Sequence, residues 1–247
     1  MYTLKYVVNK IHCHDSLDFL KNMPSDSVDL IFTSPPYNKT GYRGGKISDR
    51  RWVGDIAYDL YEDNMEELKY REWQIQVLNE CYRVIKPTGS ILYNHKIRRS
   101  KSKASHPMEW ILKSNAVFYQ QITWDRGSTP DMNVNYLIPT TELIFWLVKD
   151  KPKCNRNIRD FSTEVWRIPP DSGNTHPAPF PLLLANVAIL LTTSEGDVVL
   201  DPYVGSGTTA LSAYKLNRKY IGIDISPTYC DQSISRINDE KNKLTLF

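Results

Sequence analysis

The sequence has few cysteines and no long apolar run, and each shortage excludes a class of protein. Only four of its 247 residues are cysteines, and they stand far apart in the chain: Cys13, Cys81, Cys154 and Cys230. This spacing is typical of reduced thiols and excludes a zinc ribbon or a disulfide framework. No apolar run approaches the roughly 20 residues that cross a bilayer, and the first residues lack the pattern of a secretory signal. We therefore expect a cytoplasmic protein that does not enter a membrane.

The chain also lacks a strong net charge, but its cations are unevenly distributed. Its 31 Lys and Arg residues nearly balance 28 Asp and Glu residues, and 41% of all residues are hydrophobic, as in globular domains. Basic residues nevertheless gather in three segments: 39–51, 96–103 and 151–159. One such cluster is usually solvated surface. Three of them in a small chain, each in a loop-like segment, favour a polyanionic partner.

Hydrophobic patterning predicts an α/β fold with a mainly parallel sheet, because strand-like and helical segments alternate. The expected strands lie near 5–13, 28–33, 90–94, 117–124, 141–148, 197–201 and 219–224. The expected helices lie near 15–23, 66–86, 107–114, 180–191, 208–216 and 227–238. Only the strands at 117–124 and 141–148 have no helix between them, which predicts an antiparallel hairpin at an edge of the sheet.

A glycine-containing segment, Asp201–Thr209 (DPYVGSGTT), directly follows an apolar strand and opens a predicted helix. Glycines at the carboxyl end of a strand let the backbone approach a nucleotide-like ligand closely. Asp224 ends the next predicted strand, where an acidic side chain can hold ribose hydroxyls. No Lys follows the last glycine, and the third glycine of a dinucleotide fingerprint is missing. The segment therefore predicts a nucleotide-like cofactor and argues against a nicotinamide-dependent oxidoreductase.

A second segment, Thr33–Asn38 (TSPPYN), follows the predicted strand at 28–33. Two prolines can simply end a strand, but that reading leaves the flanking polar and aromatic residues unexplained. Proline fixes the backbone, so Pro35 can present a rigid carbonyl acceptor, and Ser34 adds a hydroxyl. Tyr37 supplies a face on which an extruded base can stack. These groups together predict a site that holds an exocyclic amino group between two acceptors.

The two segments resemble the catalytic and cofactor motifs of S-adenosylmethionine-dependent DNA amino-methyltransferases. Because the catalytic motif precedes the cofactor motif, their order resembles that of the permuted β group of the family. The resemblance extends over roughly residues 8–240. Weaker similarities involve Asp15, the segments 83–89 and 176–181, Trp124 and Glu142. The resemblance implies a Rossmann-like methyltransferase fold with a seven-stranded sheet in circularly permuted order. It also implies that residues 1–247 form a single catalytic domain.

The resemblance implies a role for particular residues of this chain. The catalytic residues would be Ser34, Pro35, Pro36 and Tyr37. S-adenosyl-L-methionine would be held by Asp15, His176, Pro177, Phe180, Asp201, Tyr203, Gly205, Ser206, Gly207, Thr208 and Asp224. Double-stranded DNA would be bound by Lys39, Arg43, Lys46, Arg98, Arg99, Lys101 and Lys103. Because 150–175 is short for a recognition domain, we expect recognition to be shared among loops 38–64, 95–106, 125–140 and 150–175.

The expected reaction transfers a methyl group to the N4 amine of a flipped-out cytosine, within a restriction-modification system. In the resembled family Ser-Pro-Pro-Tyr accompanies mostly N4-cytosine methylation, whereas Asp-Pro-Pro-Tyr accompanies mostly N6-adenine methylation. Ser34 can serve either base physically, so adenine N6 remains the first alternative, and a catalytically silent DNA-binding relative is an alternative of another class. A homodimer and a cognate restriction endonuclease are further expected partners.

No metal site is expected from the sequence. His12, Cys13 and His14 are adjacent, but successive side chains of a strand point to opposite faces, so the three cannot readily reach one ion. Methyl transfer from a sulfonium also needs no metal.

Overall fold

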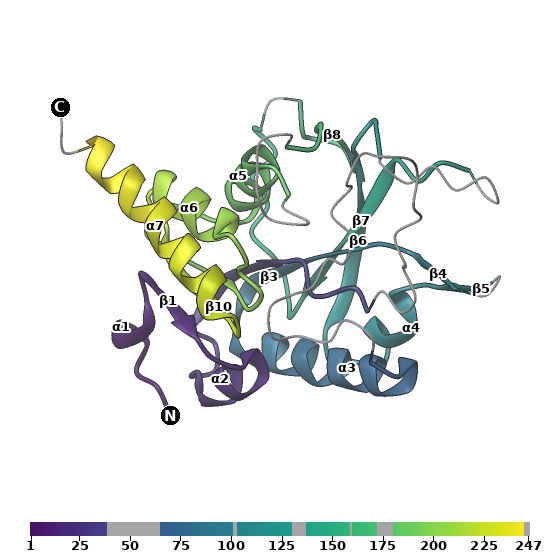
Figure 1. Ribbon diagram of the computed structural model, residues 1–247, viewed down its shortest axis with the longest axis horizontal. Coiled ribbons are helices and arrows are strands. Elements are labelled where there is room, and N and C mark those ends of the chain that lie inside the picture. The colour runs from purple at the N-terminus through teal and green to yellow at the C-terminus, as the bar shows by residue number, and fades with distance from the viewer. Residues whose placement is uncertain (39–64, 101–102, 130–136, 159, 172–179, 245–247) are drawn as a thin grey trace, which may run out of the picture.

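An eight-stranded sheet with helices on both faces forms the protein (Figure 1). The computed structural model describes residues 1–38, 65–100, 103–129, 137–158, 160–171 and 180–244. The strand order is β1-β10-β9-β2-β3-β7-β6-β8. In that order the bounds are Lys10–Cys13, Lys219–Asp224, Val198–Asp201, Val28–Thr33, Ile85–His95, Thr141–Val148, Val117–Asp125 and Val165–Arg167. The first five strands run parallel, β7 is antiparallel to both of its neighbours, and β8 pairs parallel with β6.

Two helical layers cover the sheet, one on each face (Figure 1). One layer contains α5 (Leu182–Thr192), α6 (Thr208–Lys215) and α7 (Pro227–Leu244). The other contains α2 (Ser16–Asn22), α3 (Glu67–Val84) and α4 (Met108–Ile111). Successive strand residues alternate between the two layers, as the pleat requires. Ile31 packs in the core beneath α2 and α3, whereas Phe32 packs beneath α5 and α6, and both side chains are fully buried.

All seven expected strands are present, which confirms the predicted fold class, and the eighth is β8. Its three residues lie within the expected loop 150–175, and three residues are too few for an alternating pattern to be visible in sequence. The antiparallel hairpin of β6 and β7 is confirmed, but its position at the sheet edge is wrong, because β8 lies outside β6.

Local details differ from the sequence-based expectation at four further places. The strand expected at 5–13 is confined to Lys10–Cys13, because Leu4–Val7 forms a helical turn (α1) and Asn9 adopts a positive φ of 58°. The helix expected at 107–114 is reduced to the four residues of α4, whereas α7 extends to Leu244. The expected loop 95–106 contains a two-stranded hairpin, β4 (Arg98–Ser100) and β5 (Lys103–Ser105).

The functional segments meet where the sheet topology reverses. β9 and β2 are adjacent and parallel, but the chain leaves β9 through α6 toward β10 and leaves β2 through α3 toward β3, on opposite sides. Such a divergence leaves a crevice outside the carboxyl ends of the strands, where α/β proteins bind ligands. Residues 34–38 follow β2 and residues 202–207 follow β9, so both motifs begin at this point. Within the described ranges, every helix is too short or too polar to cross a lipid bilayer.

Candidate active site

The glycine loop after β9 is held tightly against α7. Gly205 and Gly207 have φ values of 48° and 85°, in the left-handed region that glycine tolerates best. A Cβ added to Gly207 would lie 2.8 to 3.0 Å from atoms of Ser233 on α7. The Ser233 hydroxyl donates to the carbonyl of Gly205 at 2.6 Å. Glycine at 207 is therefore required both by its conformation and by the closeness of the neighbouring helix.

Asp201 ties the cofactor loop to the catalytic strand. One carboxylate oxygen accepts hydrogen bonds from the Thr33 hydroxyl at 2.7 Å and from the Tyr203 amide at 3.0 Å, and the other accepts from the Thr209 hydroxyl at 2.7 Å. The side chain is buried, and burial raises its pKa to about 6 despite these hydrogen bonds. Because its oxygens are occupied by protein donors, Asp201 joins β2, β9 and α6.

Asp224 and Asp15 lie beside the glycine loop at the same end of the sheet. Asp224 ends β10 and accepts from the backbone amides of Gly205 and Ser226, each at 2.9 Å. Its side chain is only partly covered, and burial raises its pKa. The exposed Asp15 caps α2 by accepting from the amide of Asp18 at 2.9 Å. Both carboxylates therefore have local structural partners, and their contact with a nucleoside stays a prediction.

The remaining cofactor candidates are spread around this loop. Arg236 donates to the carbonyl and, at 3.1 Å, to the hydroxyl of Ser206, and lies 3.4 Å from the hydroxyl of Thr208. Phe180 is buried against Phe32, with ring centroids 4.8 Å apart, and Tyr203 packs edge-on against Trp73. His176 and Pro177 lie outside the described residues.

The catalytic segment presents the expected hydroxyl and backbone groups. Ser34 is half-buried, and its Oγ lies 2.7 Å from the hydroxyl oxygen of Tyr37. The Pro36 carbonyl accepts from the Tyr70 hydroxyl at 2.8 Å, which secures the turn. The Tyr37 side chain is only 7% exposed, and its ring centroid lies 4.5 Å from that of His95. Stacking of a base on Tyr37 stays a prediction.

Sequence reasoning did not place three nearby polar residues in the site: Asn94 and Glu142, which contact this segment, and Arg126, which contacts Glu142. Asn94 Nδ2 lies 3.0 Å from the Tyr37 hydroxyl, and both groups donate to Glu142 Oε2 at 3.0 Å. Arg126 donates to the other oxygen of Glu142 at 2.9 Å. Asn94 and Glu142 are buried. For Asn94 and Glu142, the sequence signal that could have placed them in the site was a polar residue at the end of an otherwise apolar strand.

His95 is a buried imidazole next to the catalytic segment. Burial lowers its pKa to about 3, so the ring is neutral at physiological pH. Its Nδ1 lies 2.8 Å from the Lys96 carbonyl, and its Nε2 lies 2.9 Å from the Tyr70 hydroxyl oxygen. A neutral ring in these contacts supports the wall behind Tyr37 and adds no charge to the site.

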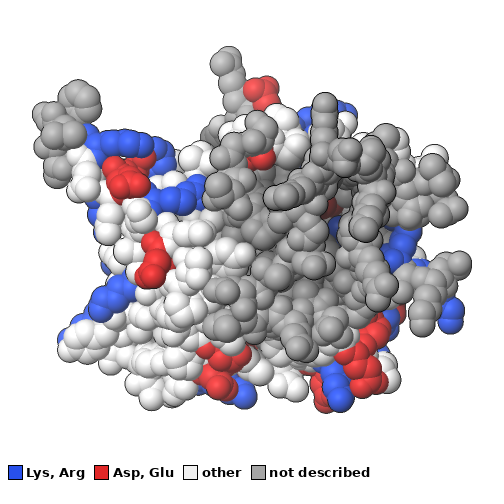
Figure 2. Space-filling model, in the orientation of Figure 1, with Lys and Arg blue, Asp and Glu red and all other residues white. Residues whose placement is uncertain are grey.

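The expected DNA-binding residues differ from one another in their surroundings. Arg98 pairs through two nitrogens with Glu67, each at 2.8 Å, and its guanidinium covers the Tyr70 ring, so this cation is engaged inside the protein. Arg99 and Lys103 are exposed on the β4–β5 hairpin. Lys39, Arg43, Lys46 and Lys101 lie outside the described residues. On the face in Figure 2, the described cations lie mainly toward the periphery and near acidic residues, without forming one continuous patch.

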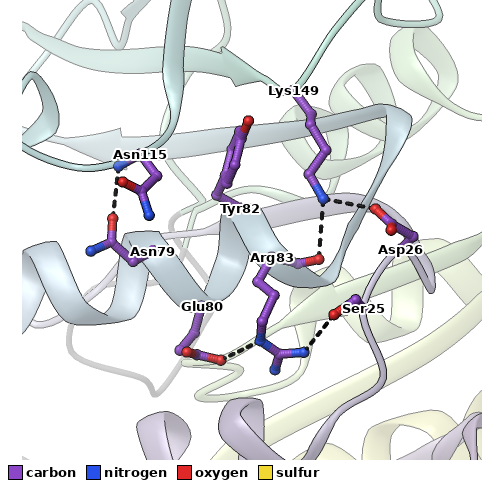
Figure 3. Close-up of a pocket in the computed structure, with 8 residues that line it drawn as sticks. All are labelled: Ser25, Asp26, Asn79, Glu80, Tyr82, Arg83, Asn115 and Lys149. Carbon is purple, nitrogen blue, oxygen red and sulfur yellow. Dashed lines mark hydrogen bonds and ion pairs between the residues drawn. The ribbon is translucent and has the colours of Figure 1, made fainter.

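A pocket of about 380 Å³ lies at the opposite end of the sheet (Figure 3). Lys149, which follows β7, donates to Asp26 and to the carbonyls of Arg83 and Ile85 at 2.8 to 3.2 Å. Arg83 itself donates to Glu80 and Ser25. The cations of this pocket stabilise the end of α3 and the start of β3, and neither motif reaches it.

Known proteins resemble this chain over most of its length. The DNA methylase family profile matches residues 28–235. Type II methyltransferase M.BglII from Bacillus subtilis is 29% identical over 96% of this chain and 72% of its own length. Type II methyltransferase M.HpaI from Haemophilus parainfluenzae is 31% identical over 94% of this chain and 75% of its own length. DNA adenine methyltransferase YhdJ from Escherichia coli (strain K12) is 28% identical over 91% of this chain and 81% of its own length.

The fold has close counterparts among solved structures. PvuII DNA methyltransferase (cytosine-N4-specific) superposes with a TM-score of 0.74 at 22% identity, over 92% of this chain and 85% of that one. The family profile covers most of this chain, and M.HpaI exceeds 30% identity over nearly all of it. The chain therefore belongs to the DNA methylase family, whose members transfer methyl groups from S-adenosyl-L-methionine to DNA.

Proposed function

We propose that this enzyme methylates the N4 amine of a cytosine that has been flipped out of double-stranded DNA. The observation that carries the proposal is the position of Ser34 and Pro35 at the carboxyl end of β2, directly beside the glycine loop that follows β9. Thr33 and Asp201 join the two segments by a hydrogen bond of 2.7 Å. A methyl donor bound on one segment and an amine bound on the other would therefore lie next to each other.

The cofactor loop suits S-adenosyl-L-methionine by its shape and its acids. Gly205 and Gly207 give the loop backbone φ values of 48° and 85°, and Asp224 presents a partly covered carboxylate at the end of the adjacent strand. Asp224 and Asp15 would contact the nucleoside, and Tyr203 and Phe180 would bound its apolar surroundings. When bound, the cofactor supplies an electrophilic methyl group on a sulfonium.

The protein contributes positioning and hydrogen-bond acceptors. The exocyclic amine of a base is conjugated with its ring and is a weak nucleophile. Ser34 Oγ and the Pro35 carbonyl would accept its N–H groups and direct its lone pair toward the methyl group. Alignment of this kind is worth roughly 7–11 kcal/mol of barrier, which exceeds the few kcal/mol needed to flip a base.

Cytosine is the proposed base because serine begins the Pro-Pro segment. The structural counterpart PvuII methyltransferase is named as cytosine-N4-specific, in line with this choice. Adenine N6 is the second candidate, because YhdJ, at 28% identity, is named as an adenine methyltransferase. Either base presents an exocyclic amine, so the same acceptors would serve both.

We further propose that residues 1–247 act as one catalytic domain, with DNA recognition shared among loops 38–64, 95–106, 125–140 and 150–175. A cognate restriction endonuclease would share the recognition sequence, since several relatives are named type II methyltransferases. A homodimer would enlarge the covered stretch of duplex. Because the enzyme would act on cellular DNA together with the endonuclease, we propose that it is located in the cytoplasm.

Nucleoside analysis tests the proposal. The protein is incubated with methyl-labelled S-adenosyl-L-methionine and unmethylated DNA of mixed sequence, and the digested nucleosides are separated by mass. We expect N4-methylcytosine. N6-methyladenine would overturn the assignment of cytosine as the target base but keep the site. If no nucleoside carries the label, the proposed DNA methylation is contradicted. Ser34→Ala, processed in parallel, should lose the label.

A further inference from the structure

A chain of hydrogen bonds links the catalytic segment to an ion pair on β6 and β7. It runs from Ser34 through Tyr37 to Glu142, the second residue of β7, and ends at Arg126, directly after β6. Asn94 on β3 lies alongside it. The members come from four separate parts of the sheet, so their meeting is a property of the tertiary structure.

The direction of these hydrogen bonds follows from counting hydrogens. Glu142, paired with Arg126, is a carboxylate and can only accept. The Tyr37 hydroxyl has a single hydrogen, which it donates to Glu142 Oε2 at 3.0 Å. Tyr37 can therefore only accept in its 2.7 Å contact with Ser34. The hydroxyl hydrogen of Ser34 consequently points toward Tyr37.

Asn94 reinforces the same direction. Its amide nitrogen lies 3.0 Å from Glu142 Oε2, 3.0 Å from the Tyr37 hydroxyl and 3.4 Å from Ser34 Oγ. The reversed amide would place a carbonyl oxygen against a carboxylate oxygen at that distance, which is repulsive. The nitrogen must therefore face these acceptors and donate its two hydrogens to the nearer pair, Glu142 and Tyr37, so Tyr37 accepts from both Asn94 and Ser34.

We propose that Glu142, held by Arg126, is a positioning residue that makes Ser34 Oγ a hydrogen-bond acceptor for the target amine. This inference rests on the proposed function, because it specifies how Ser34 meets its substrate. With its own hydrogen committed to Tyr37, Ser34 presents lone pairs to an N–H donor. Exocyclic amines of cytosine and adenine donate, whereas their neighbouring ring nitrogens accept, so Ser34 binds the amine and does not bridge to the ring.

Glu142→Gln tests the inference while preserving the shape of the side chain. A glutamine amide can donate to Tyr37, which frees the Tyr37 hydrogen to point at Ser34 and lets Ser34 turn its own hydrogen outward. We expect the single-turnover rate of methyl transfer to fall 10- to 100-fold, with an unchanged dissociation constant for S-adenosyl-L-methionine. Glu195→Gln, an exposed change in the turn before β9, is the matched control and should behave as wild type.

A double-mutant cycle separates positioning from packing. In a Ser34→Ala background no hydroxyl remains to be directed, so Glu142→Gln should cause no further loss. An equal loss in both backgrounds, or a rate within twofold of wild type for the single variant, would overturn the inference. If Glu142→Gln fails to fold, Tyr37→Phe interrupts the same chain and should lower the rate similarly, and wild-type turnover in that variant would also overturn it.

The same assay distinguishes failure of this inference from failure of the proposed function. An active wild-type enzyme that tolerates Glu142→Gln refutes the inference alone. A wild-type enzyme that methylates adenine refutes only the assignment of cytosine, and the cycle is then measured on adenine. A wild-type enzyme that transfers no methyl group to DNA overturns both.

Discussion

The two halves of the crevice are built differently. On the cofactor side, the glycine loop is held largely through its backbone groups, which bond to Ser233, Asp224 and Arg236. On the catalytic side, Ser34 and Tyr37 depend on long side chains from other strands, chiefly Glu142. The cofactor half thus has a rigid shape, whereas the catalytic half has a defined direction of hydrogen bonding.

The difference suggests where each half is vulnerable. A loop packed this closely against a helix is disrupted by added volume, because at Gly207 an added Cβ meets not only the hydroxyl of Ser233 but also its Cβ and Cα, which cannot rotate aside. A hydrogen-bonded chain tolerates small changes of volume but is disrupted when a donor becomes an acceptor. The following predictions test this contrast.

The largest effect is expected from removal of the acceptor itself. Ser34→Ala should lower turnover by about 100-fold or more, since one preorganised hydrogen bond to a reacting group is typically worth that much. Binding of S-adenosyl-L-methionine, measured by calorimetry, should be unchanged. Near-normal turnover would remove Ser34 from the catalytic assignment.

Added volume should damage the cofactor half selectively. In Gly207→Ala, the new methyl group meets Ser233 at 2.8 to 3.0 Å, and the residue keeps a φ of 85°. Backbone strain alone costs about 1–3 kcal/mol, so thermal unfolding should shift downward and cofactor affinity should fall. Gly127→Ala is the matched control, because Gly127 has a φ of 69° but no atom within 4 Å of the added Cβ. Equal effects in the two variants would exclude the steric contribution.

Removal of the Asp224 carboxylate should weaken cofactor binding alone, if it holds the ribose as proposed. Asp224→Ala should raise the dissociation constant of S-adenosyl-L-methionine by about tenfold, in line with the loss of one charge-assisted hydrogen bond. Turnover at saturating cofactor should recover most of its value. A dissociation constant equal to that of wild type would refute the role of Asp224.

Two neighbouring arginines should respond differently to charge reversal. Arg99→Glu with Lys103→Glu should reduce the slope of log affinity for DNA against log salt by about 2, because each phosphate contact contributes about 1. Arg98→Glu should lower the thermal stability instead, because Arg98 pairs with Glu67 inside the protein. An unaltered salt slope would show that Arg99 and Lys103 do not contact DNA phosphates.

The last prediction concerns pH and Asp201. Burial raises the pKa of Asp201 to about 6, above its ordinary value, so the folded protein holds this proton more firmly than the unfolded chain. The contribution to stability is complete at low pH and is lost as pH rises through 6, to a limit of about 3 kcal/mol. Denaturant unfolding between pH 4 and 7 should therefore show wild type losing stability relative to Asp201→Asn. If the difference in unfolding free energy between wild type and Asp201→Asn stays constant across this pH range, the raised pKa of Asp201 is excluded.

Sequence reasoning succeeded where a feature is continuous along the chain. The seven expected strands and both motif loops are each defined by a few neighbouring residues, and all of these strands occur. It was weaker where the context is distant. Arg98 looked like an exposed member of a basic cluster, but Glu67 and Tyr70 engage it. The three residues of β8 carry no pattern of their own and pair only because β6 is available.

The sequence by itself determined the fold class, the family and the order of the two motifs, because local patterning and short motifs specify each of them. Only the tertiary structure decided which groups surround Ser34. Tyr37 meets Asn94 and Glu142, which lie 57 and 105 residues away along the chain. That meeting depends on the parallel pairing of β2 with β3 and the antiparallel register of β3 with β7. Side-chain hydrogen bonds require contact within about 3 Å, and strand register is what provides such contact between distant residues.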